Sequence, residues 1–163
     1  MSLISLLTTF CTDPEIALTC VFEFPEQIPL TVKIRDLIDK EQKPEKYYYK
    51  ESHQYYPMLK EVMRSWDTVY QWRRVYVREN QSNVCPTLTA NMGTGGHNVP
   101  LILDDFGIRK LTPRECARFQ GFPNTYKLPE LANSKLYYQI GNSVTVPLIR
   151  RIAKQMKLVI NAQ

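Results

Sequence analysis

The sequence has little of what a metal centre or a disulfide framework requires. Its histidines are His53 and His97, and its four cysteines form no CxxC pair: Cys11, Cys20, Cys85 and Cys116. A histidine-rich metal centre is therefore not expected, and neither is a zinc site built on paired cysteines. We interpret the cysteines as reduced thiols of a cytoplasmic protein.

Long hydrophobic runs are also missing. No apolar stretch approaches the roughly 18 residues that a membrane-spanning helix needs. The opening segment, residues 1–20, is apolar, but it has no basic n-region and is interrupted by Asp13, Pro14 and Glu15. We therefore expect neither a signal peptide nor a membrane anchor, and residues 1–3 are compatible with a cloning leader.

The composition is that of a soluble globular protein. The chain has 163 residues, of which 44% are apolar and 23% charged, enough for one domain or a small domain with an appended piece. The net charge is +5. Such a surplus is compatible with a polyanionic partner, although many ordinary enzymes share it.

The hydrophobic pattern predicts an α+β fold of short, irregular strands and loops. Strands are expected over 3–10, 16–24 and 68–80, and behind the glycine-bearing loop before residue 104. Helices are expected near 34–38, over 55–66 with Leu59, Met63 and Trp66 on one face, over 112–120 and over 146–160. The residues between the last two helices are interpreted as a connector.

The segment "RKLTPRECARFQGFP", Arg109 to Pro123, is the most strongly signalled helix. Thr112 and Glu115 form a T-x-x-E capping box, and Pro113 occupies the first helical position. Gly121 and Pro123 then end the helix. A short capped helix accounts for these signals, but not for the basic residues at 109, 110, 114 and 118.

This segment resembles the ninth motif of DNA (cytosine-5)-methyltransferases, and "YQIGNSVTVPLIRRIA" resembles their tenth and last. The strong likeness covers about Arg109–Ile160. The segment "CPTLTANMGTGGHNVPLI" is similar to the glycine-bearing part of the target-recognition region in bacterial members, and "FPEQIPLTVKIRDLI" more weakly to the connector before it.

Other motifs of that family are missing from this chain. It has no Pro-Cys pair, which in the family supplies the nucleophile, no Glu-Asn-Val triplet and no glycine-rich turn near its start. The resemblance therefore implies the C-terminal portion of such an enzyme. Residues 1–30 would be a remnant of the catalytic domain and connector, 31–125 the target-recognition domain, and 126–163 a connector and the last helix. In the family that helix packs on a Rossmann-like catalytic domain.

The resemblance assigns Gly141, Asn142 and Ser143 to the S-adenosylmethionine pocket. Glycine would let the backbone approach the cofactor, and the two polar side chains would offer donors and acceptors. The alternative is that Asn142 and Ser143 serve only as turn and cap residues. We expect the cofactor in the full assembly and not on the isolated chain.

The recognition region would hold double-stranded DNA from which the target base is extruded. Candidate contacts are polar, basic or glycine residues: Arg73, Arg74, Arg78, Thr89, Thr94, Gly95, Gly96, His97, Asn98, Arg109 and Arg114. The alternatives are a solvated strand face for each arginine and a plain surface loop for the glycines. The tyrosines at 47–49 and 55–56 are expected to pack the domain.

These inferences predict the DNA-recognition portion of a bacterial restriction–modification methyltransferase, inactive alone and completed by an N-terminal catalytic part. Two alternatives remain open: a non-catalytic DNA-binding or interaction module from an interrupted gene, and part of an RNA (tRNA) cytosine methyltransferase. The apolar stripe on the last helix also predicts that the isolated chain dimerises, swaps that helix, or folds it onto its own recognition domain.

Overall fold

A computed structural model describes residues 22–73, 75–80, 83–94 and 98–161. The chain divides into two compact units, one of Met1–Pro29 with Val146–Gln163, and one of Leu30–Thr145. The predicted recognition domain, residues 31–125, lies within the second unit, and its boundary stays a prediction. The strand predicted over 3–10 and most of that over 16–24 lie outside the described residues.

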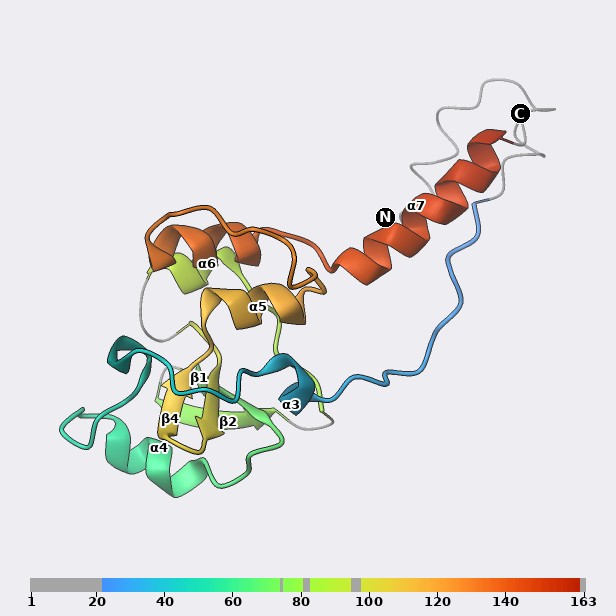
Figure 1. Cartoon of the computed structure of the whole chain (residues 1–163). Helices are drawn as coiled ribbons and strands as arrows, with labels where there is room; N and C mark the ends of the chain where they lie inside the picture. Colours follow the sequence, from blue (N-terminus) through green and yellow to red (C-terminus); the bar gives the residue numbers. More distant parts are fainter. Residues whose placement is uncertain (1–21, 74, 81–82, 95–97, 162–163) are drawn as a thin grey trace. The chain divides into compact units, whose positions relative to one another are not determined.

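The centre of the unit Leu30–Thr145 is an antiparallel sheet. Its strands are β1 (Val69–Arg73), β2 (Tyr76–Asn80), β3 (Leu101–Asp104) and β4 (Gly107–Lys110), in the order β2-β1-β3-β4. Each neighbouring pair is antiparallel. Together with the helices that cover it, the sheet confirms the α+β class (Figure 1).

The prediction of one strand over 68–80 was wrong, because this segment is a hairpin. Arg73 pairs with Tyr76, so the chain reverses over two residues between β1 and β2. The turn contains no glycine, proline or asparagine, the residues that normally signal a reversal.

Alternation along the strands sends neighbouring side chains into two separate cores. Val69 and Ile102 belong to one hydrophobic cluster, whereas the adjacent Tyr70 and Leu101 belong to the other. The sheet is therefore buried on both faces.

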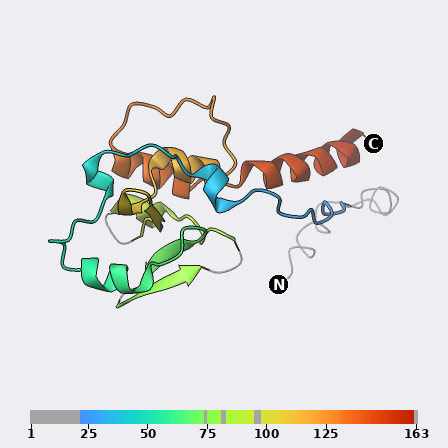
Figure 2. The same ribbon diagram turned by 60° about the horizontal axis from the view of Figure 1, so that its bottom comes forward.

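One face is covered by α4 (Tyr56–Val62), which was predicted. Leu59 of this helix and Met63 just after it are buried with Tyr70 in the second cluster. Trp66 does not share that face as predicted, since it lies beyond the end of the helix and its side chain is 40% exposed. Figure 2 shows α4 across the sheet from α5 and α6.

The other face carries the remaining short helices. These are α3 (Ile34–Leu37), η1 (Glu45–Tyr47), η2 (Ala90–Thr94), α5 (Pro113–Phe119) and α6 (Asn133–Gly141). Cys116 of α5, Met92 of η2 and Ile140 of α6 meet in the first cluster. This layer contains α5 of the ninth-motif segment, η2 of the glycine-bearing segment and, in α6, the beginning of the last motif.

The capping signals of α5 are confirmed. The backbone N–H of Glu115 donates to the Thr112 hydroxyl, and the Glu115 carboxylate accepts from the Thr112 N–H. At the other end Gly121 has φ +80°, and its N–H and that of Phe122 bond to carbonyls of the last turn. This is the Schellman arrangement, which favours glycine at that position.

The connector predicted after α5 contains the helix α6, which sequence reasoning missed. Leu136, Tyr137 and Ile140 of α6 are buried, and the Tyr137 hydroxyl donates to the Leu111 carbonyl at 2.6 Å. Burial raises the pKa of Tyr137 well above its usual value, so the hydroxyl stays protonated.

The unit that includes the C-terminus contains α7 (Val146–Asn161), which confirms the predicted last helix. None of its sixteen residues is buried. Along its apolar stripe, Ile149, Met156 and Ile160 are 43%, 50% and 65% exposed. No helix in the described ranges is long and apolar enough to cross a membrane.

Candidate nucleic-acid interface and cofactor turn

The β1–β2 hairpin presents basic and apolar side chains to solvent. Arg73 and Arg78 are exposed, and Val75 and Tyr76 at the tip are 78% and 54% exposed. One Arg78 nitrogen donates to the Asn80 side chain at 3.0 Å, which leaves most of its guanidinium in solvent. Arg74 lies outside the described residues.

Two predicted DNA-contact residues, on either side of the undescribed residues 95–97, bond to the same backbone carbonyl. The Thr94 hydroxyl and the Asn98 amide both donate to the Asn91 carbonyl, at 2.8 and 3.1 Å. Both side chains remain exposed, so their acceptor oxygens are open to a ligand. Thr89 is exposed at the start of the loop, and Gly95, Gly96 and His97 lie outside the described residues.

The segment Thr89–Gly93 packs against α6 at two glycines, Gly93 of η2 and Gly141 of α6. A Cβ at Gly93 would lie 2.6 Å from the Ser134 carbonyl oxygen and 2.9 Å from the Tyr138 Cβ. A Cβ at Gly141 would overlap the carbonyl group of Thr89 and lie 2.5 Å from the Ala90 nitrogen. Both positions therefore exclude a side chain, because real Cβ atoms do not approach other atoms so closely.

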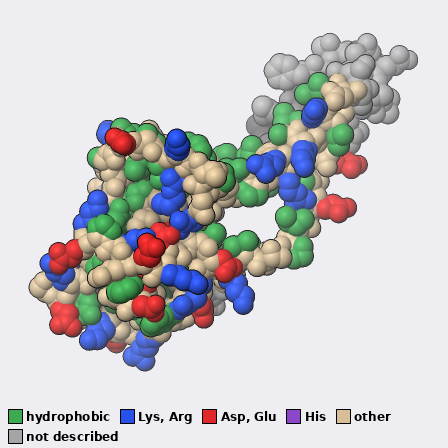
Figure 3. Space-filling view, viewed as in Figure 1, with side chains coloured by type: hydrophobic (Ala, Val, Ile, Leu, Met, Phe, Trp, Pro, Cys, Tyr) green, Lys and Arg blue, Asp and Glu red, His purple; other side chains and the backbone are tan. Residues whose placement is uncertain are grey.

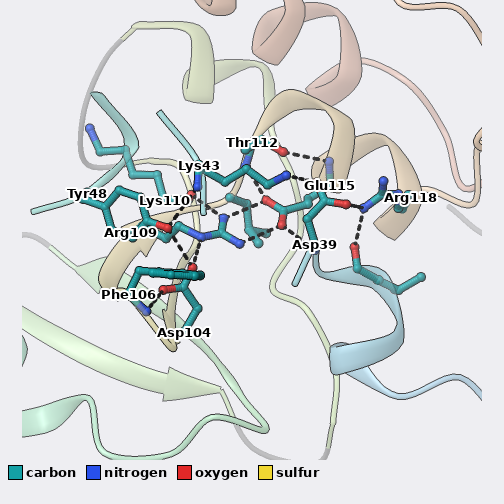
Figure 4. A network of polar contacts seen from close by, with 12 residues as sticks. Asp39, Lys43, Tyr48, Asp104, Phe106, Arg109, Lys110, Thr112, Glu115 and Arg118 are labelled. Atoms are coloured by element: carbon teal, nitrogen blue, oxygen red, sulfur yellow. Dashed lines mark hydrogen bonds and ion pairs between the residues drawn. The ribbon is translucent and has the colours of Figure 1, made fainter. Parts of the chain in front are cut away.

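Arg109 lies in a buried ionic network rather than at the surface (Figure 4). Its guanidinium forms two hydrogen bonds with Glu115, both at 2.8 Å, and its Nε donates to Asp104. Burial alone would lower the pKa of Arg109, but the hydrogen bonds and charges of the two carboxylates raise it. The guanidinium is therefore charged, and four of its five N–H donors are used within the chain, one of them on the Lys110 carbonyl.

The predicted DNA contact of Arg109 is thus incompatible with its burial, and we assign it a structural role. Arg114 is half-buried, and its guanidinium donates to the Tyr126 carbonyl at 2.6 Å. That bond uses one of five donors, so Arg114 keeps others for a phosphate.

A second part of the network attaches the segment before η1 to α5. Asp39 forms ion pairs with Lys43 at 2.8 Å and with Arg118 at 2.5 Å. The Asp39 N–H also donates to Glu115 at 2.9 Å. Sequence reasoning missed Asp39 and Asp104, because no local pattern indicates which distant cations they meet.

The turn after α6 holds the three predicted cofactor residues. Gly141 is the last residue of the helix, and its close backbone approach is to Thr89 and Ala90 of this chain. The Ser143 hydroxyl donates to the Ile140 carbonyl at 2.6 Å. Asn142 is exposed, and within the described residues its side chain makes no hydrogen bond.

The described residues offer neither a reactive thiol nor a set of metal ligands. Cys85 and Cys116 are free thiols, half-buried and buried. Burial raises the pKa of Cys85 to about 12, so its thiol is protonated at neutral pH. Among the residues that the structure describes, no group of three or more His, Cys, Asp or Glu side chains is placed to hold a metal ion.

Comparison with known proteins places the chain among enzymes that methylate DNA. The family model described as "C-5 cytosine-specific DNA methylase" matches residues 19–158. Since this match covers most of the chain, the chain belongs to that family, and the family inferred from the two motifs is confirmed.

Curated relatives have the same character. Over 137 residues the chain is 60% identical to the Type II methyltransferase M.Bsp6I of Bacillus sp. (strain RFL6), covering 83% of this chain and 44% of that protein. It is 36% identical over 140 residues to M.DsaV of Dactylococcopsis salina, covering 83% and 38%. It is 29% identical over 149 residues to M.HpaII of Haemophilus parainfluenzae, covering 83% and 41%. The chain thus spans less than half the length of these relatives.

Proposed function

We propose that this chain is the DNA-recognition portion of a cytosine-5 DNA methyltransferase of the Type II restriction–modification kind, and that it also supplies one wall of the cofactor site. The observation that carries the proposal is the family match over 19–158 in a chain that spans less than half of its curated relatives. The remaining parts of the enzyme would come from an N-terminal catalytic part or subunit of the same enzyme.

The missing motifs and the two cysteines that the structure describes, Cys85 and Cys116, support a catalytic nucleophile carried elsewhere. The sequence has no Pro-Cys pair and no Glu-Asn-Val triplet. A cysteine nucleophile must reach its thiolate form and meet the substrate. Cys85 has a pKa raised to about 12 by burial, and Cys116 has no exposed surface. We therefore expect no methyl transfer by this chain alone.

The DNA surface would combine the β1–β2 hairpin with the loop that follows η2. Arg73 and Arg78 are exposed cations suited to phosphates, and Val75 and Tyr76 offer an apolar tip. Thr94 and Asn98 hold exposed acceptors beside the loop. Figure 3 shows acidic and basic side chains interspersed on the visible face of this unit, so DNA contact would depend on these local elements and not on an overall basic face.

The chemistry of the turn after α6 fits S-adenosylmethionine in part. When bound, this cofactor supplies the methyl group that the reaction transfers. The exposed amide of Asn142 has both donors and acceptor available, and the Ser143 hydroxyl oxygen keeps acceptor capacity. Gly141 packs on the backbone of Thr89. We therefore expect it to hold the turn in place and not to make room for the cofactor.

The apolar stripe of α7 would pack on the N-terminal catalytic portion. Ile149, Met156 and Ile160 are substantially exposed, and a soluble chain gains by covering such a stripe. Self-association is the competing way to cover it. Analytical ultracentrifugation separates the two: we expect a 1:1 complex with the catalytic portion, and dimers of this chain only in its absence.

A complementation assay tests the whole proposal. The chain would be mixed with the portion of the Bacillus relative that it does not match, and transfer of labelled methyl groups to duplex DNA would be measured. We expect activity in the mixture and none with either component alone. Salt-dependent duplex binding without activity in the mixture would favour a non-catalytic module, and methylation of tRNA instead of DNA would favour an RNA enzyme.

A further inference from the structure

Gln120, the C-cap residue of α5, reaches the turn that follows α6. Its Nε2 donates to the carbonyls of Ile140 and Ser143, at 3.4 and 3.5 Å. Its Oε1 accepts from the Thr145 hydroxyl at 3.1 Å. One side chain therefore contacts the residues before, within and after the turn.

The chemistry of these partners requires an amide. Two carbonyl oxygens can only accept, so the NH₂ group must face them, and the opposite oxygen is then placed to accept from a hydroxyl. Gln120 is 9% exposed, so its polar atoms have little access to water as an alternative. A carboxylate here would place negative charge against two carbonyls, and an alanine would leave them without this donor.

The turn is also held from its other side. Gly141 packs directly on the backbone of Thr89 and Ala90, and the Ser143 hydroxyl donates to the Ile140 carbonyl. The backbone around Asn142 is thereby fixed, whereas the Asn142 side chain is exposed and makes no hydrogen bond within the described residues. A free polar side chain on a fixed backbone is what an oriented ligand contact needs.

We propose that Gln120 is a positioning residue, which holds the Asn142–Ser143 turn in the conformation that binds S-adenosylmethionine. The proposal rests on the function proposed above. It assigns a role in cofactor affinity to a residue of α5 that lies in the recognition unit and would not itself touch the cofactor.

Hydrogen exchange of the chain alone tests whether Gln120 holds the turn. Gln120→Glu and Gln120→Ala should make the Asn142 and Ser143 amides exchange about tenfold faster, the effect expected when a few weak hydrogen bonds are lost. Exchange at Leu136 and Tyr137, earlier in α6, should stay within twofold of wild type in the same samples, about the scatter of the method. Gln139→Ala, an exposed glutamine on the same helix, is the matched control and should change neither region. Unchanged exchange at Asn142 and Ser143 in both Gln120 variants would overturn the proposal.

Kinetics of the complemented enzyme test whether the turn serves the cofactor. Gln120→Glu should raise the KM for S-adenosylmethionine about tenfold and leave the duplex Kd near the wild-type value. Faster exchange with an unaltered KM would show that the turn is held by Gln120 but does not bind the cofactor, and would also overturn the proposal. If the wild-type mixture is inactive, the proposed function fails, while the exchange data still decide whether Gln120 holds the turn.

Discussion

Arg109 and Glu115 form a two-pronged ion pair, with both nitrogen–oxygen distances at 2.8 Å and both side chains fully buried. The pair joins β4 to the first turn of α5. Glu115 also accepts from the backbone N–H groups of Asp39 and Thr112. One carboxylate thus connects three segments of the unit Leu30–Thr145.

Removing one partner of this pair should be severely destabilising. We expect Arg109→Met to lower the free energy of unfolding by about 3–5 kcal/mol, because it leaves the buried Glu115 charge without its cation. Urea denaturation measures the change. The matched control is Arg35→Ala, which breaks the exposed pair with Asp67 and should cost less than about 1 kcal/mol. A loss for Arg109→Met no larger than the control's would contradict the assignment of a structural role.

Asp39 should make stability depend on acid pH. Burial raises the pKa of its carboxyl, but ion pairs with Lys43 and Arg118 outweigh burial and hold the pKa below its ordinary value of 3.8. A depressed pKa means that the carboxylate stabilises the fold above 3.8 and that this contribution is lost as the pH falls further.

The measurement is urea denaturation of wild type and Asp39→Asn from pH 7 down to acid. The stability difference between them should be constant near neutral pH and shrink once the pH falls below 3.8. A difference that does not change with pH would show that the contribution of Asp39 is not ionic.

Gly141→Ala should destabilise the unit although alanine favours helices. Its Cβ would overlap the Thr89 carbonyl, and the strain of an overpacked contact costs about 1–3 kcal/mol, more than the helix-propensity gain of about 1 kcal/mol. Thermal or urea unfolding tests this. Gln139→Ala on the exposed face of α6 is the control and should be nearly neutral. An equally neutral Gly141→Ala would show that the backbone at Thr89 and Ala90 moves aside at little energetic cost.

The arginines of the β1–β2 hairpin should carry phosphate contacts. We expect Arg73→Ala and Arg78→Ala each to weaken duplex binding and to reduce the slope of log K against log salt by about 1. Fluorescence anisotropy at several salt concentrations measures both quantities. Lys60→Ala removes an exposed cation from α4, on the other side of the sheet from η2, and should leave the slope unchanged. A slope that falls equally for all three variants would point to diffuse attraction instead of a defined surface.

Local signals in the sequence predicted the elements that depend on local chemistry. Thr112 and Glu115 predicted the N-terminal cap of α5, and Gly121 predicted its C-terminal end. The structure has all three residues in those roles. The hairpin turn and α6 were missed for the opposite reason. The turn has arginine and valine where turn residues are expected, and α6 begins with Asn133 and Ser134 and ends with Gly141, which are typical of loops.

In the candidate site, too, residues with a local sequence signal were singled out, and contacts between distant residues were missed. Asn142 and Ser143 were assigned to the cofactor pocket through a motif; the structure places them in one turn, and their role toward the cofactor stays a prediction. The burial of Arg109 could not be predicted from its neighbours in sequence, because it depends on Asp104 and Glu115 closing around it in three dimensions. The hydrogen bonds of the Gln120 side chain to Ser143 and Thr145 likewise join residues more than twenty positions apart, so no local pattern predicts them.

The paired glycines Gly93 and Gly141 have a consequence for exchanging specificity between relatives. Because neither contact leaves room for a side-chain carbon, the segment Thr89–Thr94 and α6 can approach this closely only while positions 93 and 141 are glycine. A transplanted loop would meet a foreign helix if the cut were made between them. Residues 85–102 and 133–141 should therefore be moved together as one cassette when the target sequence of such an enzyme is redesigned.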